Sequence, residues 1–141
     1  MSPMPMSPMQ MSPMMSPNGP VLVVDDDDVT RRLVAGALAA RGYADIDEVK
    51  TLAEAGNAIS TRAYGGAVID LHLPDGNGME FVHMARRGLT SRAPEMAIVV
   101  SSAYVSARTS RLLMRLGANE VMGKPADVER IASLLSVDAA A

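Results

Sequence analysis

The stretch VLVVDDDD, residues 21–28, places four apolar residues directly before four aspartates. Four consecutive apolar residues indicate a β-strand that is buried on both faces, which is typical of a parallel sheet. Adjacent carboxylates repel one another, and where they converge they raise each other's pKa unless a cation compensates for their charge. We therefore expect a positively charged group close to the end of this strand.

The chain after this strand alternates short apolar runs with longer segments of helical periodicity. Four apolar residues recur at helical spacing and predict a helix that ends at Gly42: Val29, Leu33, Ala37 and Leu38. Further strands are predicted over 46–49, 67–71, 96–101 and 120–122, and further helices over 51–62, 79–87, 106–116 and 127–135. Five strand–helix units with right-handed crossovers predict an α/β fold with a doubly wound, five-stranded parallel sheet.

Composition and charge exclude several classes of protein. The chain has 141 residues, of which 48% are hydrophobic, so we expect one domain with a core of ordinary size. A net charge of −3 gives no general electrostatic case for binding nucleic acid or a membrane. Cysteine is absent, which excludes disulfides and thiolate metal sites. No apolar run approaches the roughly 20 residues that span a bilayer, so we expect a soluble, cytoplasmic protein.

The two ends of the chain differ from the middle. Residues 1–19 repeat Met-Ser-Pro and carry no charged side chain, and their dense prolines disfavour helix and sheet. We predict a disordered tail over 1–19, a folded domain over 20–137 and a disordered end over 138–141. The tail lacks the basic start and unbroken apolar stretch of a signal peptide. No effector domain is expected after the folded domain.

Five polar side chains follow or end the predicted strands: Asp25, Asp26, Asp70, Ser102 and Lys124. Because the carboxyl ends of parallel strands meet at one edge of a sheet, we expect all five to lie together. Three convergent carboxylates are hard oxygen ligands, and Mg²⁺ is the simplest cation to compensate for them. Lys124 adds a second positive charge, and Ser102 offers a hydroxyl.

Asp70 stands alone at the end of an apolar strand and faces a glycine-rich loop. A carboxylate in this position can attack phosphorus and form an acyl phosphate. The metal, the lysine and the hydroxyl would then neutralise charge on the equatorial phosphoryl oxygens. The sequence therefore predicts Asp70 as a nucleophile for phosphoryl transfer.

Four fragments carry a resemblance to a known family: VLVVDDDDVTRRLV (21–34), AVIDLHLPDGNGMEF (67–81), IVVSSA (98–103) and VMGKPADV (121–128). In this order and spacing they resemble a two-component response-regulator receiver domain, similar to a chemotaxis regulator. The resemblance covers about residues 20–137. It implies a flavodoxin-like (βα)5 receiver fold.

The resemblance also implies a role for each residue of the site. Asp70 would accept the phosphoryl group, and Asp25 and Asp26 would hold Mg²⁺ together with Asp70 and the backbone carbonyl of His72. Ser102 would be the switch hydroxyl, and Lys124 would contact the phosphoryl group. The donor would be a sensor histidine kinase or a histidine phosphotransfer protein. The domain would not be an enzyme in the ordinary sense, because it catalyses only its own phosphorylation and dephosphorylation.

The sequence departs from the family pattern at one position, and two further residues stand close to the site in the sequence. The family often has an aromatic residue three positions before the lysine, where this chain has Val121, so coupling between an aromatic ring and the hydroxyl is not expected in its usual form. His72 and Tyr104, each two positions beyond a site residue, would flank the path of the attacking water. We hypothesise that they tune the lifetime of the phosphoryl group.

Several assignments have simpler alternatives. Asp27 and Asp28 are better explained as an acidic helix start, with Asp27 as its N-cap. Ser101 competes with Ser102, but strand alternation points it to the other side. A basic stripe of Arg108, Arg111 and Arg115 is either a solvated face or, with Val121, the contact surface for a downstream protein.

Three other functions remain open. The chain could be a receiver-like adaptor that is never phosphorylated, or a receiver fragment of a hybrid kinase. A phosphohydrolase with an aspartyl nucleophile is less well supported. Such enzymes need a general acid two residues beyond the nucleophile, where this chain has His72, and a cap insertion, which is missing.

Overall fold

The computed structural model describes residues 19–87 and 91–140, with side chains as far as Leu135. The predicted tail over 1–19 therefore lies almost wholly outside the described residues. Within the described ranges, five strands form the main sheet: β1 (Val21–Val24), β2 (Ile46–Val49), β3 (Gly66–Asp70), β6 (Ala97–Ser102) and β7 (Glu120–Gly123). The helices are α2 (Asp28–Ala39), α3 (Leu52–Thr61), α4 (Gly78–Arg87), α5 (Ala107–Leu116) and α6 (Val128–Ala140).

The strand order confirms the predicted doubly wound sheet. The order is β2-β1-β3-β6-β7, and every neighbouring pair is parallel. The chain adds β2 on one side of β1 and all later strands on the other side, so the strand order reverses next to β1. In such sheets, functional groups gather at the carboxyl ends of the strands beside this reversal.

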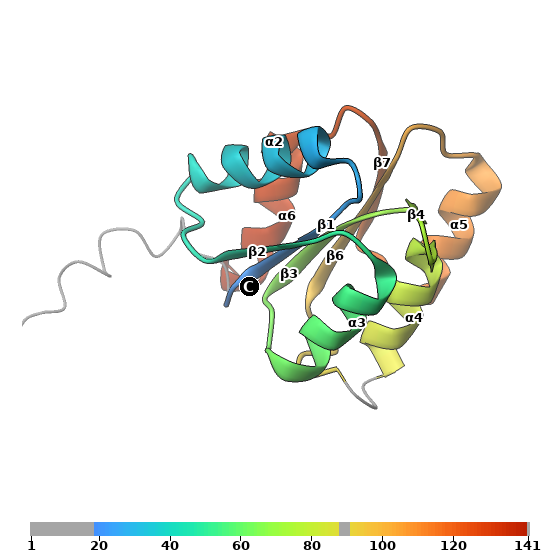
Figure 1. Ribbon diagram of the computed structural model, residues 1–141, viewed down its shortest axis with the longest axis horizontal. Helices are drawn as coiled ribbons and strands as arrows, with labels where there is room; N and C mark the ends of the chain where they lie inside the picture. The colour runs from blue at the N-terminus through green and yellow to red at the C-terminus, as the bar shows by residue number, and fades with distance from the viewer. Residues whose placement is uncertain (1–18, 88–90, 141) are drawn as a thin grey trace, which may run out of the picture.

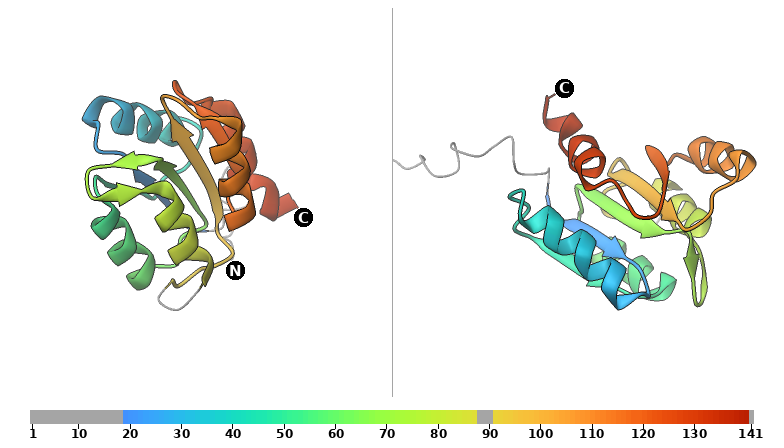
Figure 2. Two further views of the ribbon diagram at one scale, coloured as in Figure 1. Left: turned by 90° about the vertical axis from the view of Figure 1, so that its right-hand side faces the viewer. Right: turned by 90° about the horizontal axis from the view of Figure 1, so that it is seen from above.

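The helices cover both faces of the sheet and form two cores (Figures 1 and 2). Helices α2 and α6 pack on one face, where Val34, Leu38 and Ile131 are buried against β1 and β6. Helices α3, α4 and α5 pack on the other face, where Phe81 and Leu113 are fully buried. Burial on both faces explains why β1, β3 and β6 read as continuous apolar runs.

Side chains at the helix starts satisfy backbone groups that have no partner within the helix. The Asp27 carboxylate accepts from the Thr30 N–H at the start of α2, as predicted. Thr51 caps α3 by accepting from the Glu54 N–H. Ser106, predicted as the first residue of a helix, is instead the N-cap of α5. Gly117 ends α5 at a φ of 121°, a conformation that favours glycine.

Helix α2 presents a different face to the core from the one that its apolar residues indicate. Val29 is 68% exposed and Leu33 is 67% exposed, so of the four residues that predicted this helix only Leu38 is fully buried. The buried face consists of Arg31, Val34, Ala35 and Leu38. The periodicity correctly predicts a helix here, but it does not indicate which face is buried, because two of the large apolar residues face outward.

Two further differences concern the ends of elements. The glycine-rich loop that follows Asp70 contains a small antiparallel hairpin of β4 (His72–Leu73) and β5 (Gly76–Asn77). Helix α6 continues beyond Leu135, where we expected it to end, and includes residues 138–140. The added segment, SVDAA, contains no glycine or proline that would end a helix. In the described part of the chain, no helix has the length and apolar character needed to span a membrane.

Candidate functional site

The predicted site residues come from the carboxyl ends of four strands. Asp25 directly follows β1, and Asp70 is the last residue of β3. Ser102 is the last residue of β6, and Lys124 directly follows β7. The structure therefore places all four strand ends at one edge of the sheet, as the parallel arrangement predicts.

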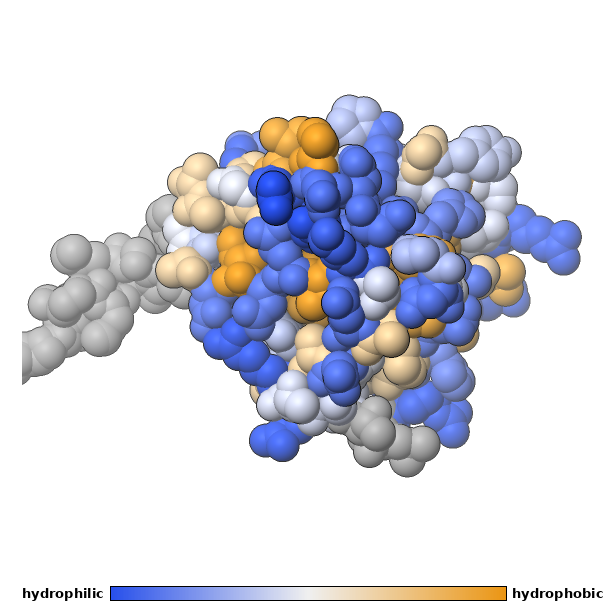
Figure 3. Space-filling view, viewed as in Figure 1, coloured by the Kyte–Doolittle hydropathy of each residue, from blue (hydrophilic) through white to orange (hydrophobic). Residues whose placement is uncertain are grey.

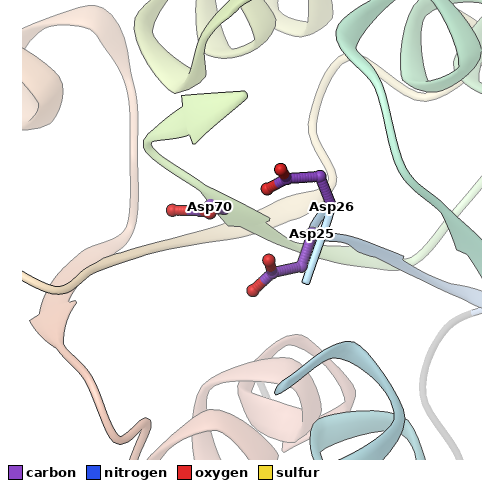
Figure 4. A group of neighbouring side chains, drawn as sticks. All are labelled: Asp25, Asp26 and Asp70. Carbon is purple, nitrogen blue, oxygen red and sulfur yellow. The ribbon is translucent and has the colours of Figure 1, made fainter. Parts of the chain in front are cut away.

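Three carboxylates converge at this edge. Oxygens of Asp25, Asp26 and Asp70 lie within 4.8 Å of one another. Figure 4 shows Asp25 and Asp26 diverging from the end of β1 on either side of the Asp70 side chain. Asp25 and Asp70 are only 4% and 7% exposed, whereas Asp26 is exposed to solvent. The site is thus a group of acids that is closed on the protein side and open beside Asp26.

Lys124 provides the positive charge that the aspartate run requires. Its Nζ lies 2.9 Å from Asp25 Oδ2 and 3.3 Å from Asp70 Oδ2. Burial opposes the charged form of Lys124, but its contacts with Asp25 and Asp70 outweigh this effect and raise its pKa. A single ammonium bridges two buried carboxylates, and therefore cannot balance all three acids.

The environment of Asp70 raises the pKa of its carboxyl above the usual value of an aspartate. Burial is the main cause that raises the pKa of Asp70, and the neighbouring Asp25 charge raises it further. A hydrogen bond from the His72 N–H to Asp70 Oδ1 and the contact with Lys124 partly oppose this shift. The reactive carboxylate is therefore destabilised in its ionised form, which additional positive charge at this edge would relieve.

The four aspartates of the opening stretch have four different roles. Asp25 lies inside the site, where its two carboxylate oxygens accept from Lys124 and from the Asp27 N–H. Asp26 faces solvent at the rim. Asp27 caps α2, and Asp28 forms ion pairs with Arg31 at 2.8 Å and Lys50 at 3.3 Å. Three of the four carboxylates thus have a cationic or N–H partner and the fourth faces solvent, which explains how the sequence tolerates four in a row.

The Ser102 hydroxyl bonds to the backbone of the following loop. It donates to the Tyr104 carbonyl at 2.9 Å and accepts from the Tyr104 N–H at 3.3 Å. Ser102 is fully buried, whereas Tyr104 is 77% exposed. Ser101 pairs in register with Asp70 across the β3–β6 ladder. In this conformation Ser102 therefore holds the β6–α5 loop, and Lys124 is the side-chain donor that contacts Asp25 and Asp70.

Two features at this edge were not predicted from the sequence. The first is Arg31, which is buried and bonds to the Asp25 carbonyl. Its spacing of three residues from Asp28 was the available signal. The second is the exposed apolar pair Val29 and Leu33, whose spacing predicts the helix but not their exposure. Figure 3 shows a hydrophobic patch over α2.

The family follows from a comparison of the whole domain. Residues 21–136 match the family model for the response regulator receiver domain. The chain belongs to this family. The match confirms the family that the four sequence fragments indicated. The order of the observed sheet, with helices on both faces, is that of the receiver fold. Receiver domains are parts of response regulators, which are proteins of two-component signalling.

Known response regulators resemble this receiver domain over most of its length. It is 39% identical over 116 residues to the photosynthetic apparatus regulatory protein RegA of Rhodobacter capsulatus, covering 82% of this chain and 60% of RegA. It is 31% identical over 134 residues to the acid tolerance regulatory protein ActR of Sinorhizobium medicae, covering 95% of this chain and 66% of ActR. The chain thus spans about two thirds or less of the length of these relatives.

A solved structure supports the receiver fold. A response regulator protein from Burkholderia pseudomallei superposes with a TM-score of 0.73 and 25% identity, covering 87% of this chain and 71% of that chain. Its crystal structure contains a phosphorylated aspartic acid and a calcium ion.

The acidic group of this receiver domain suits a divalent cation. Receiver domains bind such a metal in an acidic pocket, and here the pocket consists of Asp25, Asp26 and Asp70. Their carboxylates are hard oxygen ligands, and among the residues that the structure describes Lys124 is the one ammonium paired with them, which leaves two of the three negative charges uncompensated. The exposed side at Asp26 leaves access for water and phosphate oxygens, which Mg²⁺ retains as ligands. The residues present therefore fit a divalent metal.

Proposed function

We propose that this receiver domain is a phosphorylation-dependent switch that accepts a phosphoryl group on Asp70 and acts through protein contacts. The donor is the phosphohistidine of a sensor histidine kinase or a histidine phosphotransfer protein. The observation that carries the proposal is the arrangement of Asp70 itself. Its carboxylate is buried at the carboxyl end of β3, 3.3 Å from the Lys124 ammonium and beside two further acids.

The chemistry is an exchange of one bond to phosphorus. A carboxylate oxygen of Asp70 attacks the phosphorus, the new O–P bond forms, and the P–N bond to the donor histidine breaks. Lys124 contributes an ammonium to a phosphoryl oxygen, and Ser102 contributes a hydroxyl once it leaves the Tyr104 backbone. Asp25, Asp26, Asp70 and the His72 carbonyl would hold Mg²⁺, which when bound neutralises charge on the phosphoryl oxygens.

The experiment that tests this proposal uses a small-molecule phosphodonor. The full chain is incubated with acetyl phosphate and Mg²⁺, and its intact mass is measured. We expect the gain of one phosphoryl group, and no gain when EDTA removes the metal. A chain that stays unmodified with Mg²⁺ present would instead support the adaptor alternative, in which the domain works without phosphorylation.

The apolar patch on α2 offers a contact surface next to the acceptor. Leu33 and Val34 line a groove of about 440 Å³ with Lys124 and the following residues Pro125 and Ala126. This groove therefore joins the exposed part of α2 to the site lysine. We assign it to the phosphodonor protein, because a surface that touches both α2 and Lys124 brings a donor histidine within reach of Asp70.

The output surface is assigned to the opposite flank of the sheet. Arg108, Arg111 and Arg115 are exposed on α5, and Val121 is partly buried against the core beneath it. The exposed part of α5 also carries Leu112 and Met114, so this face combines positive charge with apolar area. Such a face suits a downstream protein with an acidic and apolar contact element.

We propose a cytoplasmic location, where histidine kinases present their phosphoryl groups, and no role in binding nucleic acid or membranes.

Two residues beside the site are expected to control how long the phosphoryl group persists. His72 and Tyr104 are both exposed and follow Asp70 and Ser102 by two positions. We expect His72→Asn and Tyr104→Ala each to change the rate of dephosphorylation severalfold, because each alters access of water to the acyl phosphate. The decay of phosphorylated chain, followed by intact mass after removal of the donor, measures this rate. His83→Asn, on the exposed face of α4, is the control. Unchanged decay in both site variants would show that the idea is wrong.

A further inference from the structure

Arg31 is a buried cation that lies behind the aspartate run rather than in front of it. Its side chain is only 4% exposed, although α2 is a surface helix. A buried guanidinium is costly unless its N–H groups have partners, so its contacts indicate what holds it there. It is one of the few buried charged residues in the described part of the chain, together with Asp25 and Asp70.

The contacts of Arg31 join three separate segments. Its Nε donates to Glu48 Oε1 on β2 at 3.0 Å. One terminal nitrogen, Nη1, donates to the backbone carbonyl of Asp25 at 3.1 Å and lies 2.8 Å from Asp28 Oδ1. The guanidinium therefore ties the end of β1 and the first turn of α2 to the neighbouring strand.

These bonds act on the backbone that carries the acidic group. Asp25 is held at its carboxylate by Lys124 and the Asp27 N–H, and at its carbonyl by Arg31. Arg31 contacts neither the carboxylate of Asp25 nor that of Asp26 in any bond that the structure shows. Its influence on these acids therefore passes through the main chain of 25–28.

We propose that Arg31 is a positioning residue for the metal site. By fixing the main chain of 25–28, it sets where the carboxylates of Asp25 and Asp26 lie relative to Asp70. This inference rests on the proposed function, in which those carboxylates hold Mg²⁺. On this proposal, the directional hydrogen bonds of Arg31, and not its charge, set the positions of the two carboxylates.

Charge and geometry make opposite predictions for this residue. A fixed positive charge near a divalent cation repels it, so a purely electrostatic role means that removal of Arg31 tightens Mg²⁺ binding. A positioning role means that removal weakens binding, because the carboxylates lose their preset arrangement. Lysine separates the two effects, since it keeps the charge but cannot form the same planar set of bonds.

The experiment is a Mg²⁺ titration of the full chain by calorimetry, since the sequence contains no tryptophan for a fluorescence readout. We compare the wild type with Arg31→Lys and Arg31→Met, at about 0.15 M salt to screen remote charges. We expect both variants to bind Mg²⁺ about tenfold more weakly. The controls are Arg32→Lys and Arg32→Met at the neighbouring exposed arginine, which we expect to stay within about twofold of the wild type.

Each result has a defined meaning. Wild-type affinity in Arg31→Lys, or tighter binding in Arg31→Met, overturns the positioning role and leaves the proposed function intact. A wild-type chain that binds no Mg²⁺ overturns the proposed function and this inference with it. Should the Arg31 variants not fold, Glu48→Ala removes the acceptor of the Arg31 Nε–H at a partly exposed position. We then expect about threefold weaker binding, and unchanged affinity would overturn the inference.

Discussion

Asp70→Asn is expected to abolish the gain of a phosphoryl group from acetyl phosphate while the chain stays folded. An amide has almost the same shape as the carboxylate but is not a nucleophile toward phosphorus, so the acyl phosphate cannot form. Intact mass after incubation with acetyl phosphate and Mg²⁺ measures the outcome. Asp45→Asn, an exposed aspartate at the amino end of the sheet, is the matched control and should be phosphorylated like the wild type.

The same variant should also be more stable than the wild type in metal-free buffer. The pKa of Asp70 is raised, mainly by burial, so its ionised form destabilises the folded state. This penalty is fully present above the raised pKa and disappears as the pH falls below the ordinary pKa of an aspartate. We therefore expect the free energy of unfolding of Asp70→Asn to exceed that of the wild type by about 1 kcal/mol at pH 7, the size of a typical single-residue effect, and to equal it at pH 3.

For the phosphorylation experiment, a gain of mass in Asp70→Asn at the wild-type level would contradict the assignment of Asp70 as the acceptor.

Lys124→Met is expected to slow phosphorylation by roughly 10²–10³-fold, the usual effect of removing one preorganised group that stabilises transition-state charge. The Lys124 ammonium is placed by its contacts with Asp25 and Asp70, and so it is ready to meet an oxygen of the incoming phosphoryl group. The rate of mass gain at saturating Mg²⁺ measures the effect. Lys50→Met provides a matched control, because Lys50 is the only other lysine and pairs with Asp28 at the surface.

Loss of this lysine should also lower the free energy of unfolding. Two buried carboxylates would lose their shared cation, and breaking a fully buried pair costs about 3–5 kcal/mol. Lys124 retains 20% exposure, so we expect roughly 2 kcal/mol after allowing for solvent screening. Urea unfolding measures this difference, and added Mg²⁺ should recover part of it by replacing the missing charge. A phosphorylation rate within twofold of the wild type would contradict the role of Lys124.

The edge where the site residues meet could be predicted from the sequence because it depends on topology alone. In a parallel sheet every strand ends at the same edge, so an acid after β1, an acid ending β3 and a lysine after β7 are expected on one rim. The individual contact between Lys124 and Asp25, 99 positions apart, was not predicted, because β3 and β6 lie between their strands and only the packed structure shows how far the lysine reaches. The cation required by the aspartate run was also predictable, because repulsion between carboxylates does not depend on detail.

The features that could not be predicted depend on packing between neighbouring elements. The orientation of α2 about its axis does not follow from the apolar spacing, because Val29 and Leu33 face outward while Arg31 faces inward. Apolar periodicity assumes that apolar residues are buried, and it fails where an arginine finds acceptors on β2 and at the end of β1. The bonds from Ser102 to Tyr104 likewise depend on a local loop conformation that spacing does not reveal.

The measurement that tests the central claim most directly is chemical mapping of the phosphorylated residue. The full chain is phosphorylated with acetyl phosphate and Mg²⁺, the acyl phosphate is reduced with borohydride, and peptides are sequenced by mass spectrometry. Reduction of an aspartyl phosphate leaves homoserine at the modified position, so the account predicts homoserine at position 70 and at no other aspartate. Homoserine at position 25 or 26, or a stable phosphate on a serine or threonine, would contradict it.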